Sequence, residues 1–308
     1  MANSKHLDEI MVKHNHVANL QVVFVDIEKY SKRRTKTQTE VIERFTTALR
    51  ETLTFTSKEY VEYSQANQIN FQEDIITIPT GDGAAVVFSF NGLSEIHLFF
   101  ATQLLEQISK MNAETPCDKF GEQGWCNCHA NFGVRIGISQ DNGIIYRDIN
   151  ENYNVAGNVI NMAARVMGLA EKNQIIFTQE AFKQIIDMVD EPDLVDHFRE
   201  FPKVRLKHGI EQDVHQYIGR GEEWISSEAP EQLGLMLRAD KAMETFTAIT
   251  GMPRPSPDEG NKGLSKMVGL MEAMGSLFTE ASDAQPKNVI DVKSKVTDDD
   301  GKPHDKKA

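Results

Sequence analysis

Apolar residues along the chain recur first at the spacing of a strand and then at that of a helix. The run VVFVDI at 22–27 predicts a buried strand. A Thr-x-x-Glu capping box at 37–40 precedes apolar residues at helical spacing, so a helix is expected next. Those apolar residues are Val41, Phe45, Ala48, Leu49 and Leu53. Residues 71–90 predict two strands joined by a tight turn at 79–83.

Similar patterns continue to residue 218. We expect helices at 94–110, 156–170 and 180–189, and strands at 131–139, 143–148, 174–178, 204–207 and 214–218. Strand, helix, hairpin, helix, strand is the order of the ferredoxin-like split βαβ arrangement. The sequence therefore predicts an α+β fold.

Changes in composition divide the chain into four parts. Residues 1–18 resemble a polar lead-in, and 19–220 are expected to form the α+β domain. Residues 221–282 contain two amphipathic, methionine-rich segments at 232–250 and 264–278, predicted to be a helical extension. These helices are expected to pad the core, join a dimer or hold a partner. The tail at 283–308 is almost free of apolar residues and is predicted to be disordered.

Bulk composition narrows the class of protein. The chain has 308 residues, 40% of them hydrophobic and 26% charged, as in an ordinary soluble globular protein. Its formal net charge of −13 disfavours nucleic acid and anionic membranes as partners. We find no apolar signal segment and no run of about 18 apolar residues. A cytoplasmic protein without a transmembrane segment is expected.

Three cysteines, Cys117, Cys126 and Cys128, lie in a predicted loop at 113–128. Their odd number argues against a disulfide framework and for a reducing compartment. The segment CNCH at 126–129 lacks the usual C-x₂₋₄-C spacing of a zinc site and has no obvious second ligand pair. A loop of reduced thiols is therefore favoured over zinc.

Two aspartates are the first candidates for chemistry. Asp26 ends the first predicted strand, and by itself it could cap a helix, pair with Arg33 or Arg34, or bind a metal. Asp82 lies in the turn of the following hairpin, which can lie beside the end of that strand in a split βαβ sheet. Two carboxylates that converge there repel each other unless a cation lies between them. A site for two Mg²⁺ or Mn²⁺ ions, as used in phosphoryl or nucleotidyl transfer, is therefore predicted.

Asn161 and Arg165 are four residues apart on a predicted helix and so share one face. The residues between them, Met162 to Ala164, are small or apolar and suit burial. A guanidinium on such a helix needs an anion if it is buried. This pair is the second candidate group.

Four blocks of sequence together resemble class III nucleotidyl cyclases. They are VVFVDIEKYS at 22–31, PTGDGAAVVF at 79–88, VRIGIS at 134–139 and GNVINMAARVMG at 157–168. Their order and spacing match that family over roughly residues 20–219. The resemblance implies a class III cyclase catalytic domain that works as a head-to-tail homodimer, with two composite active sites that bind a nucleoside triphosphate.

The resemblance also assigns roles to residues. Asp26 and Asp82 of one subunit would hold two divalent cations, with the backbone carbonyl of Ile27 as a further ligand. The polar turn after Asp26 would offer backbone N–H groups to phosphates. Asn161 of the other subunit would orient the ribose, and its Arg165 would stabilise charge on the α-phosphate.

Two positions bear on the choice of base. Where purine-specific relatives carry lysine or glutamate, this chain has Ile78, which cannot hydrogen-bond a purine edge. Where adenylate cyclases carry aspartate, it has Asn154, whose amide can pair with uracil or with cytosine. The pattern resembles bacterial anti-phage pyrimidine cyclases, whose cyclic UMP or cyclic CMP activates a separate effector protein. UTP is favoured over CTP.

Four further residues are candidate substrate contacts. Lys207 resembles the lysine that holds the distal phosphates, although Lys203 and Arg205 lie nearby. Tyr30, Arg33 and Phe71 are candidate base or phosphate contacts, for which packing or a solvated surface role is at least as well supported.

Three other functions fit the same residues. One is an adenylate cyclase with atypical base contacts. Another is a catalytically inactive cyclase-like module that only binds nucleotide or dimerises. A metal-dependent phosphodiesterase or polymerase shares the two-carboxylate chemistry, but the acidic charge disfavours a polymeric substrate.

Overall fold

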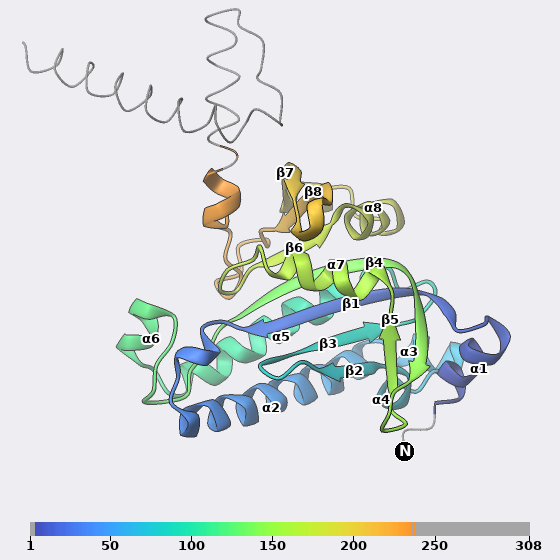
Figure 1. The fold of residues 1–308 in the computed structure, drawn as a ribbon, viewed down its shortest axis with the longest axis horizontal. Helices are drawn as coiled ribbons and strands as arrows, with labels where there is room; N and C mark the ends of the chain where they lie inside the picture. The colour runs from blue at the N-terminus through green and yellow to red at the C-terminus, as the bar shows by residue number, and fades with distance from the viewer. Residues whose placement is uncertain (1–3, 236, 238–308) are drawn as a thin grey trace, which may run out of the picture. The chain divides into compact units, whose positions relative to one another are not determined.

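The structure is a computed structural model that describes residues 4–235 and 237. Its centre is a four-stranded antiparallel sheet in the order β2-β3-β1-β4, with a helix after β1 and another after β3 (Figure 1). In chain order the elements are β1 (Val17–Ile27), α2 (Thr35–Glu59), β2 (Ile76–Pro79), β3 (Gly83–Phe88), α5 (Ile96–Ala113) and β4 (Val134–Arg147). This is the split βαβ arrangement, so the predicted α+β fold is confirmed.

The sheet continues beyond β4 on the side away from β1. β6 (Ile175–Thr178) pairs with β4 in parallel, and β8 (Glu211–Tyr217) and β7 (Phe198–Arg205) follow as antiparallel strands. β5 (Tyr153–Ala156) pairs only with the distal part of β4 and lies close to β2 (Figure 1). The sequence had not predicted β5.

Helices cover both faces of the sheet. On one face, α2, α5 and α8 (Gln179–Met188) enclose the main core, which contains Val23, Val25 and Phe177. On the other face, α1 (Lys5–Lys13) and α7 (Asn158–Met167) enclose a smaller cluster around Leu20 and Val22. The remaining short elements are η1 (Tyr30–Lys32), α3 (Val61–Asn67), α4 (Phe71–Asp74), α6 (Asp118–Gln123), η2 (Leu194–His197) and η3 (Lys207–Gly209).

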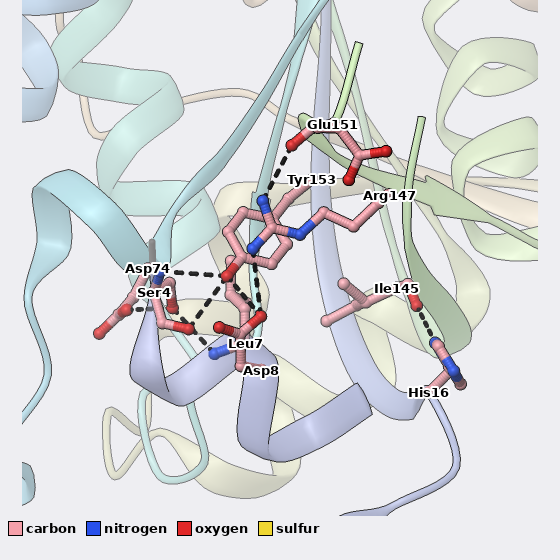
Figure 2. Close-up of polar contacts among 9 residues, drawn as sticks. All are labelled: Ser4, Leu7, Asp8, His16, Asp74, Ile145, Arg147, Glu151 and Tyr153. Atoms are coloured by element: carbon pink, nitrogen blue, oxygen red, sulfur yellow. Dashed lines mark hydrogen bonds and ion pairs between the residues drawn. The ribbon is translucent and has the colours of Figure 1, made fainter. Parts of the chain in front are cut away.

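The N-terminal segment is packed into the fold, which differs from the expected polar lead-in at 1–18. Leu7 and Ile10 of α1 are buried in the smaller cluster. Ser4 is also buried: its hydroxyl caps α1 through the Leu7 N–H and donates a hydrogen bond to Asp74. The Ser4 N–H donates to the Tyr153 hydroxyl at 3.0 Å (Figure 2). A segment without an apolar run is thus fixed by a few long-range contacts.

The same contacts tie α1 to β5. Asp8 accepts a hydrogen bond from the Tyr153 hydroxyl at 2.7 Å and pairs with Arg147 at 3.2 Å. The Arg147 guanidinium lies 3.7 Å from the centre of the Tyr153 ring, and it also donates to the Glu151 carbonyl (Figure 2). This cluster fixes the strand that carries Asn154.

Two other expectations need correction. The predicted strands at 131–139 and 143–148 are one continuous strand, β4. Its Asp-Asn-Gly segment at 141–143 looks like a turn, but those residues pair with residues 18–20 of β1. The capping box at Thr37 is absent, because α2 already begins at Thr35 and has no side-chain cap.

The folded unit also extends past residue 220. Ile225 packs into the main core, and Leu233 packs with Phe201 and Val214. Apart from 232–235 and 237, the methionine-rich segments and the tail at 283–308 lie outside the described residues. Among the helices that the structure describes, none is long and apolar enough to cross a bilayer.

A buried histidine gives the protein a predicted pH dependence of stability. His97 of α5 is completely buried; its Nδ1 accepts the Leu98 N–H, and its Nε2 has no partner in the described structure. Burial lowers the pKa of His97 to about 3. The unfolded chain binds a proton at this residue below about pH 6.5, whereas the folded chain does not, so stability is lost as the pH falls.

We expect His97 to cost about 1.4 kcal/mol of unfolding free energy for each pH unit below about 6.5. Urea unfolding at pH 7 and pH 5 measures this slope. His215, whose pKa burial lowers to about 4, adds a loss of the same sign. Comparison with His97→Gln isolates the contribution of His97. An equal change of unfolding free energy with pH in the two proteins would contradict the role given to His97.

Candidate active site

The structure brings Asp26 and Asp82 to one edge of the sheet. Asp26, the penultimate residue of β1, pairs with Gly83, the first residue of β3. Asp82 immediately precedes Gly83, and its carbonyl accepts the Ile27 N–H at 3.0 Å. Both aspartates are half-buried, and the charge of Asp82 contributes to raising the pKa of Asp26. The two candidate metal ligands therefore lie next to each other.

Gly83 permits this close approach. A Cβ atom at this position would lie 2.0 Å from the Val25 carbonyl oxygen and 3.0 Å from the Asp26 Cα. Any other residue would push the hairpin away from the end of β1. The second glycine of the Gly-Asp-Gly segment thus sets the spacing of the two aspartates.

Asp26 has a partner that sequence reasoning missed. Arg135 of β4 lies opposite Asp26 in the β1–β4 register, and its Nε donates to Asp26 Oδ2 at 2.7 Å. Burial is the largest influence on Asp26 and raises its pKa, while the hydrogen bond and charge of Arg135 lower it. Arg135 belongs to the VRIGIS block, but only strand pairing shows which carboxylate it faces.

The donor set fits hard divalent cations. Two carboxylates and the adjacent Ile27 carbonyl supply the oxygen ligands that Mg²⁺ and Mn²⁺ prefer. A cation between the carboxylates would also offset the repulsion from Asp82 that raises the pKa of Asp26. The residues present are therefore compatible with the predicted metal pair.

The turn after β1 is less open than the sequence suggested. Its Glu28 N–H donates to the Gly133 carbonyl at 3.0 Å, and its Arg34 N–H donates to Asn127 Oδ1 at 2.9 Å. These two N–H groups bond within the protein, so they are not among those that could face phosphates.

Asn161 and Arg165 lie on the outward side of α7. The opposite side of the helix is buried: Val159, Met162, Ala163, Val166 and Met167. Asn161 is exposed and donates to the Gly157 carbonyl at 3.0 Å. Arg165 is half-buried, with its Nη1 3.3 Å from Met162 Sδ. Within the described part of the chain, neither side chain has a carboxylate partner.

A second glycine seats α7 on the sheet. A Cβ atom at Gly137 of β4 would lie 2.2 Å from the Ala163 carbonyl oxygen and 2.3 Å from the Met167 nitrogen. The helix backbone therefore rests directly on β4. This contact explains the glycine of the VRIGIS block, and it fixes the height of Asn161 and Arg165 above the sheet.

Ile78 and Asn154 come from strands that lie close together. Ile78 of β2 packs against the smaller cluster, which includes Tyr153 and Val155, the neighbours of Asn154. Asn154 is half-buried, and its Oδ1 accepts the Val155 N–H at 2.7 Å. The two candidate base-reading positions thus lie in one region of the molecule.

Measured along β4, Asn154 lies far from the position of Asp26. Asp26 lies opposite Arg135, whereas Asn154 lies opposite Tyr146. At about 3.3 Å per residue, the strand between these two positions runs for up to about 36 Å. Ile78 differs: through β3 it is level with Phe24, two residues before Asp26 on β1, so only Asn154 is paired with the distal end of β4.

The other candidate contacts have varied settings. Lys207 is exposed at the connection between β7 and β8 and has no ion pair with a described residue. Tyr30 packs against the main core, and Phe71 is buried in it. Arg33 is buried and donates to the Cys126 carbonyl at 2.9 Å. Packing roles are thus favoured for Tyr30, Arg33 and Phe71, and Lys207 stays available to a ligand.

Comparison with known proteins gives neither a family match nor a curated relative. No protein-family model matches the sequence, and no curated protein sequence matches it.

Solved structures of cyclase domains resemble the chain at low identity. The guanylate cyclase domain of RhGC from Catenaria anguillulae, in complex with GTP, is 15% identical with a TM-score of 0.44, over 65% of this chain and 95% of that one. The adenylyl cyclase CyaB from P. aeruginosa is 16% identical with a TM-score of 0.45, over 68% and 98%. The adenylate/guanylate cyclase/hydrolase from Silicibacter pomeroyi is 18% identical with a TM-score of 0.45, over 67% and 99%.

Proposed function

We propose that the chain is a nucleotidyl cyclase that converts a nucleoside triphosphate to its 3′,5′-cyclic monophosphate and pyrophosphate. The observation that carries this proposal is the pair Asp26 and Asp82, two carboxylates held together at one edge of the sheet. Asn161 and Arg165 support it, because they project from α7 without a carboxylate partner in the described structure. The four ordered sequence blocks support the same function.

In the proposed reaction, the 3′-hydroxyl attacks the α-phosphorus and pyrophosphate leaves. Two divalent cations bound by Asp26, Asp82 and the Ile27 carbonyl would lower the pKa of that hydroxyl and neutralise the triphosphate. Asn161 orients the ribose, and Arg165 places a fixed positive charge beside the α-phosphate as negative charge grows there. Lys207 holds the distal phosphates. Positioning and charge neutralisation supply the catalysis, and no covalent nucleophile is needed.

We place the two halves of each site on different subunits of a head-to-tail homodimer. In one chain, no ion pair joins Arg165 to Asp26 or Asp82 among the described residues, and the hydrogen bonds of Asn161 and Arg165 go to Gly157 and Met162. Asn154 pairs with Tyr146, far along β4 from Arg135, the residue opposite Asp26. A two-fold dimer brings the metal-binding edge of one subunit opposite α7 and β5 of its partner.

The proposed substrate is a pyrimidine nucleotide, with UTP ahead of CTP. Ile78 offers no hydrogen bond to a purine edge, and a site without such a bond does not select for purines. Asn154 offers one donor and one acceptor, which match N3–H and O4 of uracil. An adenylate cyclase with atypical base contacts is the alternative.

Incubation of the purified protein with Mn²⁺ and each of the four nucleoside triphosphates tests the activity and the base together. We expect cyclic UMP as the main product. The double variant Ile78→Lys/Asn154→Asp installs the adenylate pattern and should raise ATP use relative to UTP at least about tenfold, because the two base-edge contacts are changed. A strong ATP preference in the unmodified protein would overturn the pyrimidine assignment, and no turnover of any nucleotide would overturn the cyclase.

We further propose that the cyclic pyrimidine nucleotide is a cytoplasmic second messenger in anti-phage defence, read by a separate effector protein. This proposal is supported by Ile78 and Asn154, because the residues at these two positions resemble the pattern of anti-phage pyrimidine cyclases. Cyclic UMP should rise in cells that carry the chain after phage infection, compared with cells that carry Asp82→Ala. An unchanged level during infection would contradict this role.

A further inference from the structure

The folded structure brings the side chains of the three cysteines close together. The sulfur atoms of Cys117, Cys126 and Cys128 all lie within 4.8 Å of one another, and Cys117 Sγ is 3.0 Å from Cys128 Sγ. All three are free thiols. Ligand sulfurs on a tetrahedral zinc, at bonds of about 2.3 Å, lie about 3.8 Å apart. The three sulfurs are close enough to share one ion, for which Cys117 Sγ and Cys128 Sγ separate by about 0.8 Å from their 3.0 Å distance. The CNCH segment has no second ligand pair in the sequence, but the fold brings one further ligand, Cys117, to it.

Hydrogen bonds hold this arrangement in place. The Asn131 side chain donates to the Thr115 carbonyl at 2.7 Å and accepts from the Thr115 hydroxyl at 3.0 Å. These bonds close the base of the loop and bring Cys117 to the other two cysteines. The ligand geometry is thus built by the fold.

We propose that Cys117, Cys126 and Cys128 form a zinc site with three protein ligands. Each thiol loses its proton on ligation, so the metal is bound by three thiolates. Cys128 is exposed, so a water molecule can complete the tetrahedron from the solvent side. Soft thiolates select zinc, whereas the oxygen donors of Asp26 and Asp82 select Mg²⁺ or Mn²⁺, and the two sites therefore bind different metals.

The zinc site would brace the turn that follows Asp26. The segment at 126–133 supplies three acceptors to that turn: the Cys126 carbonyl for Arg33, Asn127 Oδ1 for the Arg34 N–H, and the Gly133 carbonyl for the Glu28 N–H. Nε and Nη2 of the Arg33 guanidinium are buried and have no acceptor in the described structure. The position of the Arg33 side chain therefore depends on the segment at 126–133, and metal binding would fix both the segment and the side chain.

Metal analysis of the full chain tests the proposal. We purify it under reducing conditions, equilibrate it with Zn²⁺ and desalt it. We expect about one zinc per chain, the content of a single site. Cobalt substitution should give the intense absorption of tetrahedral thiolate ligation. Cys128→Ser, at the exposed cysteine, should lose the zinc and the cobalt spectrum with its circular dichroism unchanged, and Cys117→Ser should do the same.

Glu122→Gln changes an exposed carboxylate of α6, between Cys117 and Cys126; it is the matched control and should retain the metal. The proposal fails if the reduced wild-type protein holds no zinc after desalting. It also fails if peptide mapping of alkylated protein shows a Cys117–Cys128 disulfide in cells, or if Cys128→Ser keeps its zinc. None of these readouts depends on cyclase activity, so the experiment tests the zinc site independently of the proposed function.

Discussion

Replacing Asp82 with alanine should reduce cyclic nucleotide formation at least about a thousandfold, because loss of a metal ligand removes several kcal/mol of charge stabilisation. The fold should survive, since the Asp82 carbonyl, and not its side chain, bonds to the Ile27 N–H. Initial rates with saturating Mn²⁺ and UTP measure the loss. A thermal melt of the same preparation shows whether the variant is folded.

Asp196→Ala is a suitable control, because it removes an exposed carboxylate of η2 that lies outside the proposed site. Its activity should stay within a factor of about two, as expected for a surface substitution. Turnover by Asp82→Ala at a rate near that of Asp196→Ala would show that the metal assignment is wrong.

Replacing Arg165 with alanine should also cost about a thousandfold, the usual contribution of an arginine at a phosphoryl-transfer transition state. The half-buried guanidinium has no carboxylate partner in the described structure, so little stability should be lost. More informative is the heterodimer of Arg165→Ala with Asp82→Ala. One of its two composite sites contains both defects and the other contains neither, so about half of the wild-type activity should return.

Co-expression with two different affinity tags and tandem purification isolates this heterodimer. The control heterodimer pairs Asp26→Asn with Asp82→Ala, which both damage the metal-binding half of a site. It should stay inactive, because every site then contains one damaged half. Full inactivity of the Arg165–Asp82 heterodimer would refute the shared-site arrangement, and so would high activity of a wild-type monomer.

Local sequence patterns predicted much of the fold and the outline of the site. The apolar run at 22–27, the hairpin around Asp82 and the helix that carries Asn161 are all strong local signals, and each forms as expected. Topology then places Asp26 beside Asp82, because the hairpin strand β3 pairs directly with β1. Local pattern and sheet order together were enough for these residues.

Features fixed by long-range contacts could not be predicted. Arg135 meets Asp26 only through the β1–β4 register, and Cys117 meets Cys128 only after its loop closes. The polar helix α1 is held by Ser4 and two buried apolar residues, too few to stand out in a sequence window. Local propensity does not report such contacts, because each one depends on a partner distant in sequence.

The continuous strand β4 limits how this chain can vary in length. Inserting one residue between Arg135 and Tyr146 would turn every later side chain of the strand to the opposite face, and would move Asn154 relative to Asp26. Related proteins should therefore keep the number of residues here constant. Insertions and deletions should collect in surface connections instead, and between β7 and β8 they would alter the reach of Lys207 without disturbing the rest.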